Sequence, residues 1–251
     1  MFNPQVIKAE KIAKRIERMN SDKGKLITPD PEEVKRNREL LCEAGKRLLK
    51  ENLVSGTWGN ISLRVEKDFM LITPSGMEYE RLTPEDMVLM NIEDLEYEGE
   101  LKPSSEKHLH AEIYRDRPEV RAIIHAHSMN ASTVAASRRE VPPILDDMVQ
   151  ILGPSVRVAE YALPGTKSLA KKAVRALRGR NAVLLANHGA ICVGRDLEEA
   201  FVACQILEKA CKAFIESQFL GGAVPISPVE AWLMHEVYLK KYSLEKKKKK
   251  N

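Results

Sequence analysis

Residues 121–128 read RAIIHAHS, and residues 182–190 read AVLLANHGA. Each stretch is a short apolar run that ends in histidine, a pattern typical of a buried β-strand at the point where the chain leaves the sheet. His125 and His127 are two residues apart, so in an extended chain both side chains point to the same face. His188 follows the second run in the same way. The two stretches therefore predict buried strands whose ends carry histidines.

Strands and helices alternate on both sides of these stretches. Changes between period two and helical spacing predict strands over residues 60–65, 69–73, 87–92, 122–125, 157–161, 182–186 and 190–193, and helices over residues 3–20, 31–51, 103–115, 128–137, 166–177 and 197–219. No repeat and no change of composition divides the series. It predicts an α/β or α+β protein with one mixed sheet in one domain.

Charge and composition exclude several classes of protein. The formal net charge is +4, and this excess of basic residues comes from the ends, above all from Lys246–Lys250, so that the body of the chain is close to neutral. We therefore expect no nucleic-acid partner, and we expect the lysine run to be a solvated end. No apolar run is long enough to cross a membrane, and the first residues lack the apolar core of an export signal. Four scattered cysteines fit a reduced, cytoplasmic protein.

Three histidines at strand ends are a donor set suited to zinc. A catalytic zinc site commonly has three protein ligands and one open position, which His125, His127 and His188 could supply. One such histidine alone would more often be a hydrogen-bonded structural residue. His108 and His110 lie on different faces of the predicted helix, so at most one of them should line the site.

Three short segments combine glycine or hydroxyl side chains with a turn or a helix start. They are residues 56–60 (GTWGN), 73–76 (TPSG) and 102–106 (KPSSE). Free backbone N–H groups at such places can hold an anion, phosphate in particular. Each segment alone would be an ordinary turn or helix cap.

Taken in order, the segments GTWGNIS (56–62), ITPSG (72–76), LTPEDMV (82–88), KPSSE (102–106), HAH (125–127) and NHG (187–189) resemble the class II aldolase/adducin family, in particular its fuculose-phosphate aldolase type. The resemblance covers about residues 35–217. It implies a three-layer αβα domain around one mixed, largely antiparallel sheet, and a homotetramer with active sites between subunits. We divide the chain into a helical extension and linker (1–30), a catalytic domain (31–222) and a tail with the lysine run (223–251).

The resemblance also implies a role for individual residues. His125, His127 and His188 match the zinc ligands, and Glu106 matches the catalytic acid/base, which can also touch the metal. The positions that match the family's phosphate site are Gly59, Asn60, Ser75, Gly76, Ser104 and Ser105. The chain departs from the aldolase type at Trp58 in the first loop. It also places Asp147 where the aldolase has a tyrosine acting as an acid, with Asp146, Tyr161, Tyr238 and Tyr242 as alternatives.

The implied reaction is zinc-dependent aldol cleavage or condensation of a ketose 1-phosphate, similar to fuculose 1-phosphate, which gives dihydroxyacetone phosphate and an aldehyde. Three other reactions on the same scaffold stay open: sugar-phosphate epimerisation, dehydration of methylthioribulose phosphate, and decarboxylation. Epimerases of the family have Asp where this chain has Glu106. A different class is the adducin-like binding module, which lacks the metal histidines.

Overall fold

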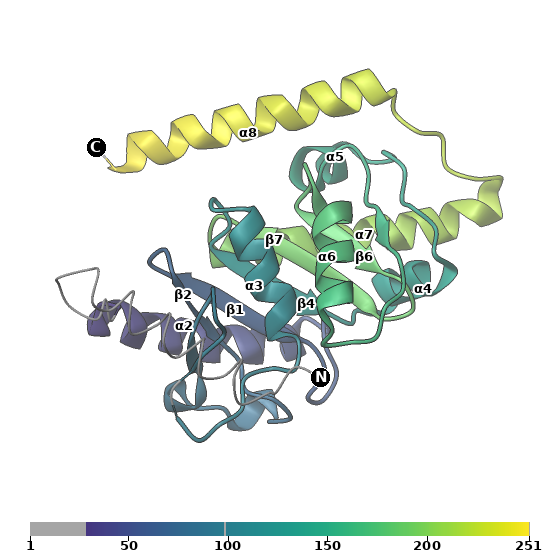
Figure 1. Cartoon of the computed structure of the whole chain (residues 1–251). Coiled ribbons are helices and arrows are strands. Elements are labelled where there is room, and N and C mark those ends of the chain that lie inside the picture. The colour runs from purple at the N-terminus through teal and green to yellow at the C-terminus, as the bar shows by residue number, and fades with distance from the viewer. Residues whose placement is uncertain (1–28, 98, 251) are drawn as a thin grey trace, which may run out of the picture.

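The computed structural model describes residues 29–97 and 99–250, so the helix expected over residues 3–20 lies outside the described part. Within it the strands form one seven-stranded sheet in the order β3-β2-β1-β4-β7-β6-β5 (Figure 1). Neighbouring strands are antiparallel except β5 and β6, which are parallel. The strands are β1 (Asn60–Val65), β2 (Phe69–Ile72), β3 (Val88–Asn91), β4 (Ala122–Ala126), β5 (Val158–Ala159), β6 (Ala182–Leu185) and β7 (Gly189–Gly194).

Helices cover both faces of the sheet. On one face α2, α4, α5 and α7 pack against side chains such as Ile61, Ile124 and Leu184. On the other face α3 and α6 pack against Ile123 and Val183. This confirms a three-layer αβα arrangement around one mixed, largely antiparallel sheet. The helices are α2 (Pro31–Lys50), α3 (Lys107–Asp116), α4 (Met129–Ser137), α5 (Asp146–Leu152), α6 (Lys167–Leu177), α7 (Leu197–Ser217) and α8 (Pro228–Lys250), with short 3₁₀ turns η1 (Tyr79–Arg81), η2 (Pro84–Asp86) and η3 (Gln218–Leu220).

Strand β4 lies at the centre of the sheet, between β1 and β7, and every residue in it is buried. A strand covered on both faces reads as a continuous apolar run, which explains its sequence. Ile124 faces the first core, whereas Ile123 faces the second. By the period of two, His125 shares the face of Ile123, on the side of α3. It is paired with Asn60 of β1 and Ile191 of β7, close to the end of the strand.

Two expectations need correction. Helix α3 begins at Lys107 with Glu106 as its N-cap, not at Pro103, because residues 102–104 bond to residues 73–75 instead. Residues 228–250 form helix α8, where the sequence pattern had predicted no helix. The first part of α8 packs on α5, where Ala231 is buried and His235 Nδ1 lies 2.9 Å from the carbonyl oxygen of Gln150. No helix within residues 29–97 and 99–250 is both long and apolar enough to cross a bilayer.

Candidate metal centre

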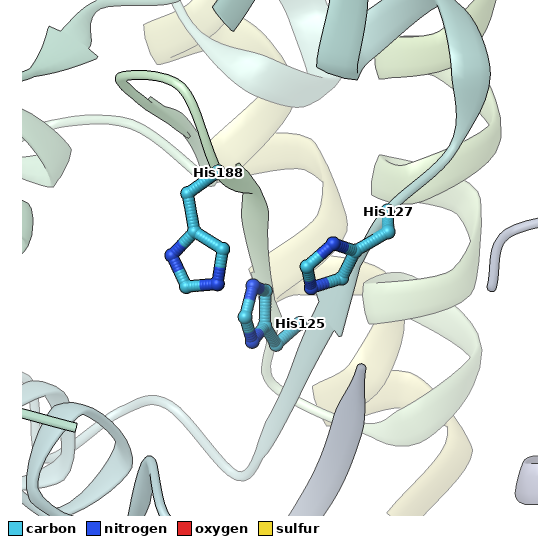
Figure 2. A group of neighbouring side chains, drawn as sticks. All are labelled: His125, His127 and His188. Atoms are coloured by element: carbon cyan, nitrogen blue, oxygen red, sulfur yellow. The ribbon is translucent and has the colours of Figure 1, made fainter. Parts of the chain in front are cut away.

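The structure brings the three histidines together as the sequence predicts. His125 ends β4, His127 follows it, and His188 lies in the turn between β6 and β7. Each offers a ring nitrogen within 4.8 Å of the nitrogens of the other two. Figure 2 shows the three imidazoles facing one another, with ring centroids 4.6 Å apart for His125 and His127, 4.8 Å for His125 and His188, and 5.1 Å for His127 and His188.

The turn that carries His188 depends on two neighbours. Asn187 adopts a left-handed conformation, with φ of 56°, and its Oδ1 accepts a hydrogen bond from Arg138 Nε at 2.8 Å. Gly189 begins β7 and has no left-handed conformation. A Cβ at Gly189 would lie 2.5 Å from the carbonyl oxygen of Ala126 and 3.4 Å from His125 Nε2. Glycine is therefore needed because β4 and β7 approach closely here, next to the triad.

The segment after His127 is fixed by a residue that the sequence did not reveal. The His127 N–H donates to the carbonyl oxygen of Leu53 at 2.9 Å. The carboxylate of Glu208, on α7, then caps the N-terminus of α4. It accepts hydrogen bonds from Ser128 Oγ at 2.7 Å, from Asn130 N at 2.8 Å and Nδ2 at 2.7 Å, and from Ala131 N at 3.0 Å. This cap lies 80 residues away in sequence from Ser128, so no local motif marks it.

Glu106 contacts the triad from the start of α3. Its side chain is buried, with Oε2 at 2.5 Å from His125 Nδ1 and Oε1 at 3.8 Å from His188 Nε2. Burial raises the pKa of Glu106, but the electrostatic interaction and hydrogen bond with His125, with a smaller contribution from His188, outweigh it and hold the pKa at about 2. Glu106 is therefore a carboxylate at neutral pH. With its proton on Nδ1, His125 donates a hydrogen bond to this carboxylate. In that tautomer the lone pair of Nε2 is free to bind a metal ion.

The residues fit a divalent cation. His125 Nε2 and His188 Nδ1 are buried without a hydrogen-bond partner, a costly state that a bound cation would relieve. Burial lowers the pKa of His127 to about 3, and it also lowers the pKa of His188, with His125 acting in the same direction on both. Both imidazoles are therefore neutral at physiological pH and able to ligate. Three imidazole nitrogen donors beside a carboxylate that orients one of them are a common zinc arrangement.

The three candidate phosphate segments meet beside this centre. Thr73 connects the segments 73–76 and 102–106 to β1. Its N–H donates to the Ile61 carbonyl at 3.1 Å, and its Oγ1 accepts from Ile61 N at 3.2 Å. Its own carbonyl oxygen accepts from Ser104 N at 3.1 Å, and Ser75 N donates to Lys102 O at 2.9 Å. Asn60 and Ser104 are buried, Gly59 is half-buried, and Ser75, Gly76 and Ser105 are exposed.

The candidates for a further acid lie elsewhere in the chain. Asp147 is on α5, where its Oδ2 accepts a hydrogen bond from Lys209 Nζ at 2.6 Å. Tyr161 follows β5 and is 46% exposed. Tyr238 is on α8, and the side chain of Tyr242 is outside the described part.

Of the remaining histidines, His110 is the one close to the centre. It lies one helical turn after Glu106, is fully buried, and has its Nδ1 2.6 Å from Ser62 Oγ. The hydroxyl of Ser62 is in turn 2.9 Å from that of Tyr114. This buried polar row supports α3 against β1 beneath Glu106, in keeping with the expectation that one of the two helical histidines would lie near the site.

Residues 39–215 match the sequence model described as the class II aldolase and adducin N-terminal domain. A 5-deoxy-D-ribulose 1-phosphate aldolase of Bacillus thuringiensis serovar kurstaki is 37% identical over 189 residues, which are 75% of this chain and 88% of that protein. A 5-methylthioribulose-1-phosphate/5-deoxyribulose-1-phosphate aldolase of Rhodospirillum rubrum is 37% identical over 174 residues, 69% of this chain and 78% of that one. A solved L-fuculose 1-phosphate aldolase superposes with a TM-score of 0.78 at 38% identity, covering 81% of this chain and 96% of its own.

Proposed function

Since the chain belongs to the class II aldolase and adducin family and is a class II aldehyde-lyase, we propose that it cleaves a ketose 1-phosphate to dihydroxyacetone phosphate and an aldehyde. The observation that carries the proposal is the contact of a buried carboxylate, Glu106, with a triad of convergent histidines beside three loops suited to phosphate. This is the set of groups that an aldol reaction on a phosphorylated sugar requires.

Class II aldolases depend on a metal, and we propose that His125, His127 and His188 hold Zn²⁺ in this chain. A bound divalent cation supplies Lewis acidity, which stabilises the negative charge that develops on the substrate oxygens as the carbon–carbon bond breaks. The hydrogen bond from His125 Nδ1 to Glu106 fixes the orientation of that imidazole. A direct bond between Glu106 and the metal stays a prediction.

Glu106 is the proposed acid/base. Cleavage between C3 and C4 leaves the electron pair on the three-carbon fragment as an enediolate, which must gain a proton at C3 to become dihydroxyacetone phosphate. As the aldehyde forms, the substrate gives up the proton of its C4 hydroxyl, and C3 gains one. Glu106 is buried and ionised, so it can hold a proton and donate it to C3. In the condensation direction the same carboxylate removes the C3 proton.

The phosphate is assigned to the loops around Thr73. Ser75 and Ser105 are exposed, and Ser105 directly precedes Glu106. We propose that these groups, with Gly59, Asn60, Gly76 and Ser104, bind the phosphate. Binding there orients the substrate carbonyl toward the triad and lowers the entropy cost of the reaction.

An adducin-like module without enzymatic activity is not compatible with this centre, because a purely structural domain has no use for three convergent histidines and an ionised carboxylate. The cytoplasm is the proposed location. All four cysteines, Cys42, Cys192, Cys204 and Cys211, are buried free thiols, which fits a reducing compartment.

The test is a panel of ketose 1-phosphates offered to the zinc-loaded enzyme: fuculose 1-phosphate, 5-deoxyribulose 1-phosphate and ribulose 1-phosphate. Release of dihydroxyacetone phosphate is followed by its coupled reduction. We expect release from at least one substrate, and none with the His188→Ala variant. Products that keep all carbon atoms, as an epimer or a dehydrated sugar, or release of CO₂, would instead identify one of the other reactions of the scaffold.

A further inference from the structure

Trp58 is a large aromatic residue exposed beside the metal centre. Its side chain is 68% exposed, and its ring centroid lies 6.1 Å from that of His127 at an interplanar angle of 52°. An indole this exposed contributes little hydrophobic stabilisation to the fold, because little of its surface is removed from water. Its place next to a proposed metal ligand indicates contact with something that enters the site.

The backbone holds Trp58 in that place. Trp58 N donates to the carbonyl oxygen of Ser55 at 3.1 Å, closing a turn, and His127 N donates to Leu53 O at 2.9 Å. Gly59 has φ of +84°, and a Cβ there would lie 2.7 Å from the carbonyl oxygen of His125. The loop 53–59 is therefore pressed against the segment that carries two of the three histidines, and the indole position follows from that contact.

The direction in which a substrate crosses the site follows from the same contacts. Ser104 and Ser105 directly precede Glu106, which contacts His125 and His188. His127 and Trp58 lie together at another corner of the triad. Asn60, which the proposed phosphate site includes, lies on the Glu106 side of the triad, with its Nδ2 3.3 Å from His125 Nδ1. A ketose whose phosphate sits by Asn60 and Ser105 and whose reacting carbons lie at Glu106 and the metal therefore extends its far end toward Trp58. An indole face cannot serve a phosphate dianion, but it can cover an apolar group.

We propose that Trp58 is a specificity-determining residue, an apolar wall that receives the aldehyde-derived end of the substrate and selects ketose 1-phosphates whose last carbon carries no hydroxyl. The inference rests on the proposed function. A methyl or methylthio end gains by leaving water against the indole, whereas a terminal hydroxyl loses its hydrogen bonds to water there. The two curated relatives described above are named for 5-deoxy and 5-methylthio sugars, both apolar at C5.

The test compares 5-deoxyribulose 1-phosphate with ribulose 1-phosphate, a pair that differs only in the C5 hydroxyl. The wild-type enzyme should prefer the deoxy sugar in kcat/KM, and Trp58→Ala should reduce that preference by about 10-fold or more, the scale for losing one apolar contact. Bound zinc and the KM for dihydroxyacetone phosphate in the condensation direction should be unchanged. Trp232→Ala, which removes the other tryptophan, 56% exposed on α8, is the matched control and should keep the preference.

Fluorescence gives a second readout, because Trp58 and Trp232 are the only tryptophans of the chain. In Trp232→Phe all indole emission comes from Trp58. Stopped-flow mixing with 5-deoxyribulose 1-phosphate should change that emission before turnover, and by more than inorganic phosphate does, because inorganic phosphate fills only the neighbouring phosphate site and leaves the indole face uncovered.

An unchanged preference in Trp58→Ala overturns the inference, as does dissociation of an oligomer by this variant, which would assign Trp58 to a subunit contact. If the wild-type enzyme releases dihydroxyacetone phosphate from both sugars equally well, this inference alone fails. If it releases none from any ketose 1-phosphate, the proposed function itself fails.

Discussion

Glu106 and the three histidines divide the work of the centre at the scale of single residues. The histidines provide nitrogen donors, whereas Glu106 accepts a hydrogen bond from His125 and carries the proton. Glu106→Gln keeps the shape and the hydrogen bond but cannot accept a proton. We expect this variant to retain most of its zinc and its affinity for a phosphorylated inhibitor, while kcat falls by on the order of 100-fold or more.

The comparison for this variant is any one of His125, His127 or His188 changed to Ala, in which zinc and turnover should fall together. Metal analysis and steady-state kinetics on Glu106→Gln and the three histidine variants separate the role of the base from that of the metal ligands. Near wild-type turnover in Glu106→Gln would show that the base lies elsewhere. Complete loss of zinc would show that Glu106 is chiefly a ligand.

His110 leads to a prediction on pH. Burial lowers its pKa to about 3, with the charge of His125 acting the same way, so it is neutral in the folded protein. An unfolded chain binds a proton at this residue below about pH 6.5, the ordinary value for histidine. Stability is therefore lost as the pH falls from about 6.5 toward 3, by roughly 1.4 kcal/mol per pH unit. Urea unfolding of the metal-free protein between pH 6.5 and pH 5 gives the free energy of unfolding at each pH. The slope of this free energy against pH should be shallower by about this amount in His110→Gln. Equal slopes in both proteins would show that His110 is not a buried neutral residue.

At the scale of elements, the junction of β4 and α4 depends on Glu208. Its carboxylate accepts from Ser128 Oγ, Asn130 N and Ala131 N, satisfying backbone donors that a helix start leaves free. We expect Glu208→Ala to lower the free energy of unfolding by roughly 2 kcal/mol. It should also weaken zinc binding several-fold, because Ser128 directly follows His127.

The control for that variant lies on the same helix. Glu216 pairs only with Lys212 in the described contacts, at 2.6 Å, and both side chains are about 60% exposed. Such a surface pair contributes roughly 0–1 kcal/mol, so Glu216→Ala should change neither stability nor zinc affinity appreciably. Chemical denaturation and zinc titration with a competing chelator measure both. Equal behaviour of the two variants would contradict the capping role of Glu208.

The elements that sequence predicted well are those with a clear period. Strand β1 has the predicted bounds, and the histidines of β4 and His188 converge because β4, β7 and β6 are neighbours. The start of α3 was misplaced because Ser104 and Ser105 look like helix caps, whereas Ser104 N bonds to Thr73, 31 positions earlier in the chain. Long-range backbone bonds leave no local pattern. The cap by Glu208 was missed for the same reason.

Helices α5 and α8 were missed for a different reason. Helix α5 spans only Asp146–Leu152, too few residues for a period to show. Helix α8 buries a narrow face through Ala231 and His235 and leaves Trp232 and Leu233 exposed, so its apolar residues form no stripe on the buried side. Tertiary packing, which sequence periodicity does not report, decides both.

At the scale of the whole molecule, large apolar side chains lie exposed along the last part of the chain. They are Phe219, Leu220, Val224, Val229, Trp232, Leu233 and Val237, in η3, in the segment between η3 and α8, and in the first part of α8. Contiguous exposed apolar surface commonly marks a protein–protein contact. We predict a homotetramer with active sites between subunits, as the family resemblance implies. Light scattering should report four chains at micromolar concentration, and a monomer would contradict the prediction.

The central claim is that His125, His127 and His188 hold one divalent metal ion on which the lyase reaction depends. The direct measurement is elemental analysis of the purified protein, combined with turnover of a ketose 1-phosphate before and after a strong chelator and after zinc is added back. The account predicts about one ion per chain, loss of turnover with the ion, and recovery with zinc. A protein that contains no metal and keeps its full activity in chelator would contradict it.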